Sequence, residues 1–196
     1  MNVIGLTGLT GAGKTTVLEV LADHGATVLD CDRLWYEMVE RDPAIRHDLE
    51  AAFGQVFLPG GALDRHKLGT LVFEDPAKLQ QLNAIVFHYM IIEVRRRLTV
   101  ARNAGIRLFA VDAVNLLESG LGELCDVTVA VLAPESKRLS RIMSRDGIGK
   151  EQALRRIRAQ KPEEYYRTHA GLLLENSGSR RELIRQTESL LAEYLQ

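Results

Sequence analysis

The sequence contains few cysteines, no clustered histidines and almost no net charge. The two cysteines, Cys31 and Cys125, lie far apart without C-x-x-C spacing, so we expect neither a disulfide framework nor a zinc site. The five histidines are scattered without the spacing of metal ligands. A formal net charge of −1 gives no reason to expect nucleic acid as the main partner.

Long hydrophobic runs are also absent. No apolar run is long enough to cross a bilayer, and no basic segment followed by an apolar segment opens the chain. We therefore expect a cytoplasmic protein with no membrane contact. Hydrophobic residues make up 46% and charged residues 26% of the 196 positions, a balance that suits one α/β domain with an insertion.

A glycine-rich motif near the start of the chain indicates a phosphate site. Gly8 to Thr15 read G-x-x-x-x-G-K-T, between an apolar run and a segment of helical character. In such a loop, backbone N–H groups and a helix N-terminus face the phosphates. We predict that Lys14 contacts the β- and γ-phosphates of ATP and that the Thr15 hydroxyl ligates Mg²⁺. The alternative, a glycine-rich turn without a ligand, is disfavoured by this context. The other expected ATP-binding residues of the loop are Gly11, Ala12, Gly13 and Thr16.

Apolar segments alternate with helical patterns along the whole chain. The expected strands are residues 2–7, 26–29, 106–111, 127–132 and 172–174. The expected helices include residues 34–40, one that starts at Asp42-Pro43 with the aspartate as N-cap, and a last one that starts at Ser179 with a capping box to Glu182. This alternation predicts an α/β fold with a doubly wound, parallel five-stranded sheet of the P-loop NTPase type. We expect the core at about 1–32, 104–135 and 170–196, a helical acceptor-binding insertion at about 33–103, and a helical lid at about 136–165.

Carboxylates follow two of the expected strands, where ligands bind in open α/β sheets. Asp32 lies further past its strand than Asp30, so it is the better candidate to accept a proton from the acceptor hydroxyl. Asp30 is expected to orient the water shell of the metal or to cap the next helix, and simple turn and cap roles for both residues remain open. Asp112 ends the third expected strand in a Walker B pattern, which predicts a contact with the metal through water.

The other motifs favour a small-molecule kinase over a GTPase. The chain has no N-K-x-D motif for reading guanine, and its D-x-x-G match at residues 146–149 lies between two expected helices. Arg138, Arg141 and Arg145 are spaced to share one helix face, which fits a lid that neutralises the transferred phosphoryl group and excludes water. A solvated basic face paired with Glu135 and Glu151 fits the same spacing.

Several motifs together resemble the dephospho-CoA kinases, which catalyse the last step of coenzyme A biosynthesis. The resemblance covers nearly the whole chain. Its motifs are G-L-T-G-x-x-x-x-G-K-[ST] at residues 5–15, [VI]-[IL]-D-x-D at 28–32, G-x-L-D-R at 61–65, R-x-x-x-R at 141–145 and A-x-x-R-I-x-x-Q at 153–160. The departures lie in segments that shape the family's acceptor pocket, where Tyr89 replaces a proline and Val114, Asn115 and Leu117 alter the D-x-P-L-L-F-E motif.

The resemblance implies roles for individual residues. Asp32 would activate the ribose 3′-hydroxyl of dephospho-CoA. Lys14, Arg141 and Arg145 would stabilise the transferred phosphoryl group, and Asn176 would contact the adenine of ATP. The residues expected to bind the acceptor are Asp32, Arg65, His88 and Asp112. The alternatives are a kinase for another nucleotide or small metabolite and, less favoured, a regulator that binds ATP without phosphorylating a small molecule.

Overall fold

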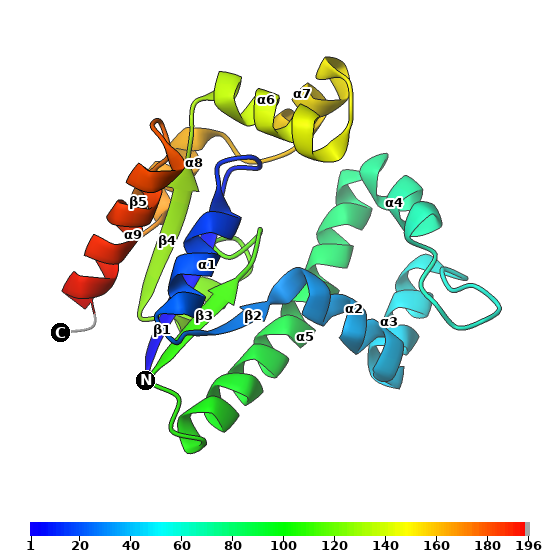
Figure 1. Cartoon of the computed structure of the whole chain (residues 1–196). Helices are drawn as coiled ribbons and strands as arrows, with labels where there is room; N and C mark the ends of the chain where they lie inside the picture. The colour runs from blue at the N-terminus through cyan, green and yellow to red at the C-terminus, as the bar shows by residue number, and fades with distance from the viewer. Residues whose placement is uncertain (195–196) are drawn as a thin grey trace. The chain divides into compact units, whose positions relative to one another are not determined.

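A five-stranded parallel sheet forms the centre of the fold in the computed structural model, which describes residues 1–194. The strand order is β2-β3-β1-β4-β5, so the predicted α/β fold with a doubly wound parallel sheet is confirmed (Figure 1). The strands are β1 (Asn2–Gly8), β2 (Thr27–Asp30), β3 (Leu108–Asp112), β4 (Val127–Leu132) and β5 (Leu172–Glu175).

The central strand β1 pairs in parallel with β3 on one side and with β4 on the other. Leu6 of β1 lies opposite Asp112, the last residue of β3. Gly8, the last residue of β1, lies opposite Val131 near the end of β4. The carboxyl ends of the three strands therefore meet at one edge of the sheet, which is where open α/β sheets bind ligands.

The chain divides into two compact units, residues 1–29 with residue 101 onward, and residues 30–100. We call them the sheet unit and the helical unit. The helices of the sheet unit are α1 (Lys14–Asp23), the 3₁₀ turn η1 (Leu121–Leu124), α6 (Glu135–Asp146), α7 (Lys150–Arg158), α8 (Glu163–His169) and α9 (Arg180–Tyr194).

The core of the sheet unit lies between the strands and their covering helices. Helices α1 and α9 contact each other along the sheet (Figure 1). Val17 of α1 and Leu183 of α9 are almost completely buried in one cluster with Leu6 of β1. Burial of each such side chain contributes about 1.5–3 kcal/mol, and the packing holds the start of α1 against the end of β1.

The helical unit contains α2 (Cys31–Arg41), α3 (Pro43–Phe53), α4 (Arg65–Phe73) and most of α5 (Pro76–Asn103). Aspartates cap all four of these helices through their side chains, and Asp75 accepts from the N–H groups of Ala77 and Lys78 at the start of α5. Asp30 accepts from the N–H of Arg33, and Asp42 and Asp64 do the same for α3 and α4. The buried core of the helical unit contains Val39, Ile45, Leu49, Val56, Leu68 and Val72.

Two local expectations differ from the structure. Helix α2 begins at Cys31, earlier than the expected start at residue 34, because Asp30 serves as its N-cap. Asp32 therefore lies in the first turn of a helix and not in a loop. Helix α8 was not expected, although Pro162 before it and the acidic Glu163 in its first turn are helix-start signals. The expected capping box of α9 is confirmed, since the Ser179 and Glu182 side chains each bind the other's backbone N–H.

Candidate phosphate-binding site

The loop between β1 and α1 has a backbone that requires glycine at two positions. Gly11 has φ 76° and Gly13, the N-cap of α1, has φ 108°. A Cβ atom on Gly13 would lie 2.5 Å from Nδ2 of Asn176, and one on Gly11 would lie 2.9 Å from the carbonyl oxygen of Arg138. Conformation and close contact together therefore exclude larger side chains at both positions.

Helix α1 presents its amino end directly after this loop. The first N–H groups of a helix have no intrahelical partners and carry the positive end of the helix dipole. The first turn of α1 has no acidic residue, and its N-cap has no side-chain hydrogen bond. Neither an acidic side chain nor a capping side chain therefore competes with an anion at this end, and the local structure suits a phosphate group.

Lys14 and Asp112 are brought together at the edge of the sheet. The Lys14 ammonium forms an ion pair with the Asp112 carboxylate, and the side chains are 23% and 12% exposed. Lys14 begins α1 and Asp112 ends β3, so the pairing follows from the register of β1 and β3. The lysine of the glycine-rich loop and the carboxylate of the Walker B pattern thus share one half-buried site.

The three arginines of α6 lie in different surroundings. Nη1 of Arg141 donates to the carbonyl oxygens of Gly11 and Ala12, at 3.2 and 3.3 Å. Arg145 is 62% exposed and pairs with Asp146, which also pairs with Arg156. Arg138 is buried, and this burial lowers the pKa of its guanidinium. The alternative of one continuous solvated basic face is therefore wrong for α6.

Asn176 also contacts the loop between β1 and α1. This residue follows β5, is 5% exposed, and donates from Nδ2 to the carbonyl oxygen of Ala12 at 2.7 Å. Its Oδ1 atom is buried and has no hydrogen-bond partner among the residues that the structure describes. The contact explains why Gly13 has no room for a side chain. Sequence reasoning did not predict this contact with the loop.

Gln160 also contacts the loop and was not among the predicted site residues. Its Oε1 accepts from the N–H of Thr10 at 2.5 Å, and its Nε2 donates to the carbonyl oxygen of Gly8 at 3.4 Å. The one sequence signal was its place as the last residue of the A-x-x-R-I-x-x-Q motif. A motif position does not say which backbone groups a side chain will contact.

The predicted acceptor-side residues Asp32, Arg65 and His88 belong to the helical unit. Asp32 is exposed in the first turn of α2. The guanidinium of Arg65 lies 3.4 Å from the centroid of the Tyr36 ring, a cation–π geometry. His88 is exposed on α5, with its ring edge-to-face against Tyr89 at 5.2 Å. Each residue is thus presented on a helix within one packed unit.

The sheet unit offers few protein ligands for a metal ion, which fits a magnesium ion that is held mainly by water and phosphate oxygens. In residues 1–194 no group of three or more His, Cys, Asp or Glu side chains is arranged to hold a metal. Thr15 is exposed at the start of α1, and Asp112 ends the neighbouring β3. Mg²⁺ keeps waters and phosphate oxygens as ligands and needs few protein groups, so one hydroxyl and one carboxylate suffice.

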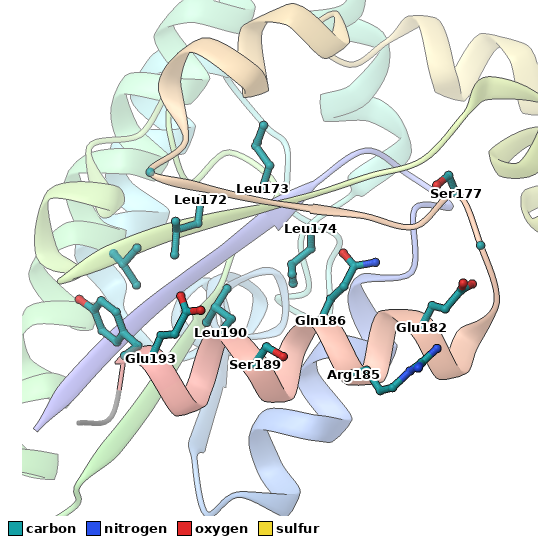
Figure 2. A pocket seen from close by; sticks show the side chains of 14 residues that line it. Leu172, Leu173, Leu174, Ser177, Glu182, Arg185, Gln186, Ser189, Leu190 and Glu193 are labelled. Carbon is teal, nitrogen blue, oxygen red and sulfur yellow. The ribbon is translucent and has the colours of Figure 1, made fainter.

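A separate hollow of about 850 Å³ lies between β5 and α9 (Figure 2). Leucines of β5, among them Leu172, line one wall, and polar side chains of α9, among them Arg185 and Glu193, line the other. The residues described as lining it include none of Gly8 to Thr15. The hollow is therefore distinct from the phosphate loop.

No helix within residues 1–194 is long and apolar enough to cross a membrane.

Comparisons with known proteins give a consistent result. The family description dephospho-CoA kinase matches residues 2–182. Dephospho-CoA kinase from Geobacter sulfurreducens is 34% identical over 194 residues, covering 98% of both chains. The enzyme of that name from Thermus thermophilus is 38% identical, covering 97% of this chain and 91% of its own length.

Solved structures agree on the fold. A Thermus thermophilus crystal structure has a TM-score of 0.76 at 36% identity, covering 98% of this chain and 97% of its own. Shikimate kinase from Acinetobacter baumannii, at 20% identity and a TM-score of 0.53, shares the fold alone and covers 98% of this chain and 94% of its own. With a glycine-rich loop between β1 and α1 and the family description matched over residues 2–182, this chain belongs to the dephospho-CoA kinase family.

Proposed function

We propose that the protein transfers the γ-phosphoryl group of ATP to the ribose 3′-hydroxyl of dephospho-CoA, giving coenzyme A and ADP. The observation that carries this proposal is the glycine-restricted loop with its Lys14–Asp112 ion pair, in a chain whose residues 2–182 match the family. The loop supports ATP as the phosphoryl donor, and membership of the family supports dephospho-CoA as the acceptor.

The sheet unit holds the nucleotide in this proposal. The amides of the loop and Lys14 bind the β- and γ-phosphates, and Thr15 and Asp112 are the residues that would hold Mg²⁺. The ion would offset the charge on the phosphate oxygens when bound. Arg141 and Arg145 of the lid stabilise the phosphoryl group in transfer. Support for Arg141 comes from its contact with the loop carbonyls, and support for an adenine contact at Asn176 comes from the family pattern.

The helical unit supplies the groups for the acceptor. Asp32 accepts the proton of the 3′-hydroxyl while the hydroxyl oxygen forms a bond to the γ-phosphorus. The bond from that phosphorus to the β–γ bridging oxygen breaks, and ADP leaves with the electron pair. Arg65 and His88 hold the acceptor. Support for Asp32 is its match to the family's D-x-D motif and its exposed position in the first turn of α2.

A coupled assay of ADP release tests both the substrate and the base. With MgATP, wild type should turn over only when dephospho-CoA is added, and Asp32→Asn should lose this turnover by about 100- to 10,000-fold while still binding ATP. Glu40→Gln is the matched control, because Glu40 is an exposed carboxylate on the same helix. It should keep wild-type turnover.

Three outcomes would contradict parts of the proposal. Turnover that survives in Asp32→Asn would keep the activity but assign the base to another residue. Turnover with a different hydroxylated nucleotide or metabolite, and none with dephospho-CoA, would show a kinase for another acceptor. ATP binding that no acceptor converts to turnover would favour a nucleotide-dependent regulator.

A further inference from the structure

The lid segment contacts the phosphate loop at both of its ends. Near its start, Arg141 of α6 donates to the carbonyls of Gly11 and Ala12. At its far end, two residues beyond α7, the Gln160 amide binds the N–H of Thr10 and the carbonyl of Gly8. The first contact involves a cation, whereas the second is made by a neutral amide that has no charge to offer a phosphate.

The orientation of the Gln160 amide follows from its two partners. A backbone N–H can only donate, so the atom facing Thr10 must be the side-chain oxygen. A backbone carbonyl can only accept, so the atom facing Gly8 must be the side-chain nitrogen. Only a side chain with one acceptor and one donor in this arrangement can make both bonds. Glutamine therefore suits this position better than glutamate or methionine of similar length.

These two bonds add to the hydrogen bonds of Leu9 in the first half of the loop. The N–H of Leu9 donates to the carbonyl of Val131 at 3.1 Å, and the carbonyl of Leu9 accepts from Ala12 at 2.9 Å. Gln160 supplies the partners of the two flanking groups, the Gly8 carbonyl and the Thr10 N–H. Without it, the hydrogen bonds that the described residues make to the loop between the end of β1 and Gly11 would be those of Leu9 and the one from Arg141.

The lid helices are also joined to each other. Ile142 of α6 packs with Ala153 and Ile157 of α7 in a small buried cluster. Ile142 also lies close to Gly11, since a Cβ there would come within 3.0 Å of its side chain. Gln160 lies two residues beyond the end of α7, so the position of the lid helices determines where its amide can reach.

We infer that Gln160 is a positioning residue, which holds the first half of the phosphate loop in its binding shape and links that shape to the end of the lid. It touches no reacting atom in this role and acts through the backbone of Gly8 and Thr10. The inference goes beyond the proposed phosphoryl transfer and rests on it only for ATP as the ligand.

The test compares the ATP affinity of two variants of Gln160 with that of the wild type. Gln160→Met keeps the length of the side chain and removes both hydrogen bonds, and Gln160→Asn keeps the amide but cannot span both partners. Gln152→Met is the matched control, because Gln152 is exposed on α7. The Kd of a fluorescent ATP analogue should rise about 5- to 20-fold in both Gln160 variants and stay within twofold in the control.

Two further readouts separate positioning from a general structural role. Amide hydrogen exchange at Thr10 should speed up in Gln160→Met, with the exchange of β4 unchanged. The KM for ATP should rise while the KM for dephospho-CoA stays the same. A folded Gln160→Met protein that binds the ATP analogue within twofold of wild type would overturn the inference. Because this binding assay needs no acceptor, a failure of dephospho-CoA to stimulate turnover would contradict the proposed function and leave the inference standing.

Discussion

The two units of this protein build their candidate sites in different ways. In the sheet unit, Asp112, Arg141, Gln160 and Asn176 reach one loop from four separate segments, and three of them bind its backbone. In the helical unit, Asp32 and His88 are exposed on helices packed around their own core. The candidate phosphate site is therefore defined by backbone shape, whereas the candidate acceptor groups are side chains on a separately packed scaffold.

This difference predicts how the two regions respond to substitution. A change in the phosphate loop should alter both stability and ATP binding, because the same contacts serve both. A change in the helical unit should alter stability or use of the acceptor and leave ATP binding intact. Substitutions of Lys14, Gly13 and Tyr89 test this separation, with effects expected to decrease in that order.

Replacement of Lys14 should have the largest effect. Lys14→Met removes the ammonium that faces Asp112 and is proposed to contact the phosphates, so kcat/KM for ATP should fall about 100- to 1,000-fold. Steady-state kinetics of ADP release would measure the loss. Lys150→Met is the control, because Lys150 is exposed at the start of α7. Near-normal activity of Lys14→Met would contradict the assignment of the phosphate loop.

Replacement of Gly13 should affect stability and binding together. Gly13→Ala combines a left-handed φ of 108° with a Cβ 2.5 Å from Nδ2 of Asn176. We therefore expect the free energy of unfolding to fall by about 2–5 kcal/mol and the affinity for ATP to fall as well. Gly25→Ala is the matched control, since Gly25 also has a positive φ, 83°, but faces open space. Urea unfolding should show only about 1–2 kcal/mol for this control.

The outcome of the double variant would sharpen that prediction. Gly13→Ala with Asn176→Ala removes the side chain that the new Cβ would meet, so part of the lost stability should return. A cost for Gly13→Ala equal to that for Gly25→Ala would show that the clash contributes nothing. The close packing of Asn176 on the loop would then have no energetic role.

Replacement of Tyr89 in the helical unit should have the smallest effect. The Tyr89 hydroxyl donates to Oδ2 of Asp48 at 2.7 Å, and Tyr89→Phe should cost about 0.5–1.5 kcal/mol with no change in ATP affinity. The hydrogen bond with Asp48, together with burial, raises the pKa of Tyr89 to about 12. A raised pKa means that this stability is present below pH 10, the ordinary value, and is lost as the pH rises toward 12.

The pH dependence gives the clearest check on Tyr89. The difference in unfolding free energy between wild type and Tyr89→Phe should be constant from about pH 7 to 9 and should shrink between about pH 10 and 12. A difference that does not change with pH would contradict the link to Asp48. A weaker affinity for ATP in Tyr89→Phe would contradict the separation of the two regions.

The sequence predicted the fold because its signals are local. Alternating apolar and helical segments indicated the parallel sheet, and the G-x-x-x-x-G-K-T motif located the loop after β1. Helix N-caps such as Asp42, which precedes Pro43 at the start of α3, could be predicted for the same reason. The start of α2 was placed too late, although the role of its N-cap, Asp30, was one of the two expected for that residue. A single carboxylate in sequence does not say which role it takes.

Contacts between distant segments could not be predicted in the same way. Asn176 and Gln160 each bind the loop across more than 140 residues. Arg138 is buried, and Glu163 and Tyr166 of α8 are among the groups that influence its charge, so its surroundings include a separate element. Spacing on a helix showed that three arginines share a face, but not which of them would be buried. Such contacts depend on the packing of whole elements, which motifs do not encode.

The central claim is that this chain moves the γ-phosphoryl group of ATP to the 3′-hydroxyl of dephospho-CoA. The most direct measurement is ³¹P NMR of the products after incubation with MgATP and dephospho-CoA, with an acceptor lacking the 3′-hydroxyl as control. The account predicts a new phosphate monoester on the ribose 3′-oxygen and ADP in equal amount, with neither product in the control. Inorganic phosphate as the main product, or phosphorylation at another position, would contradict it.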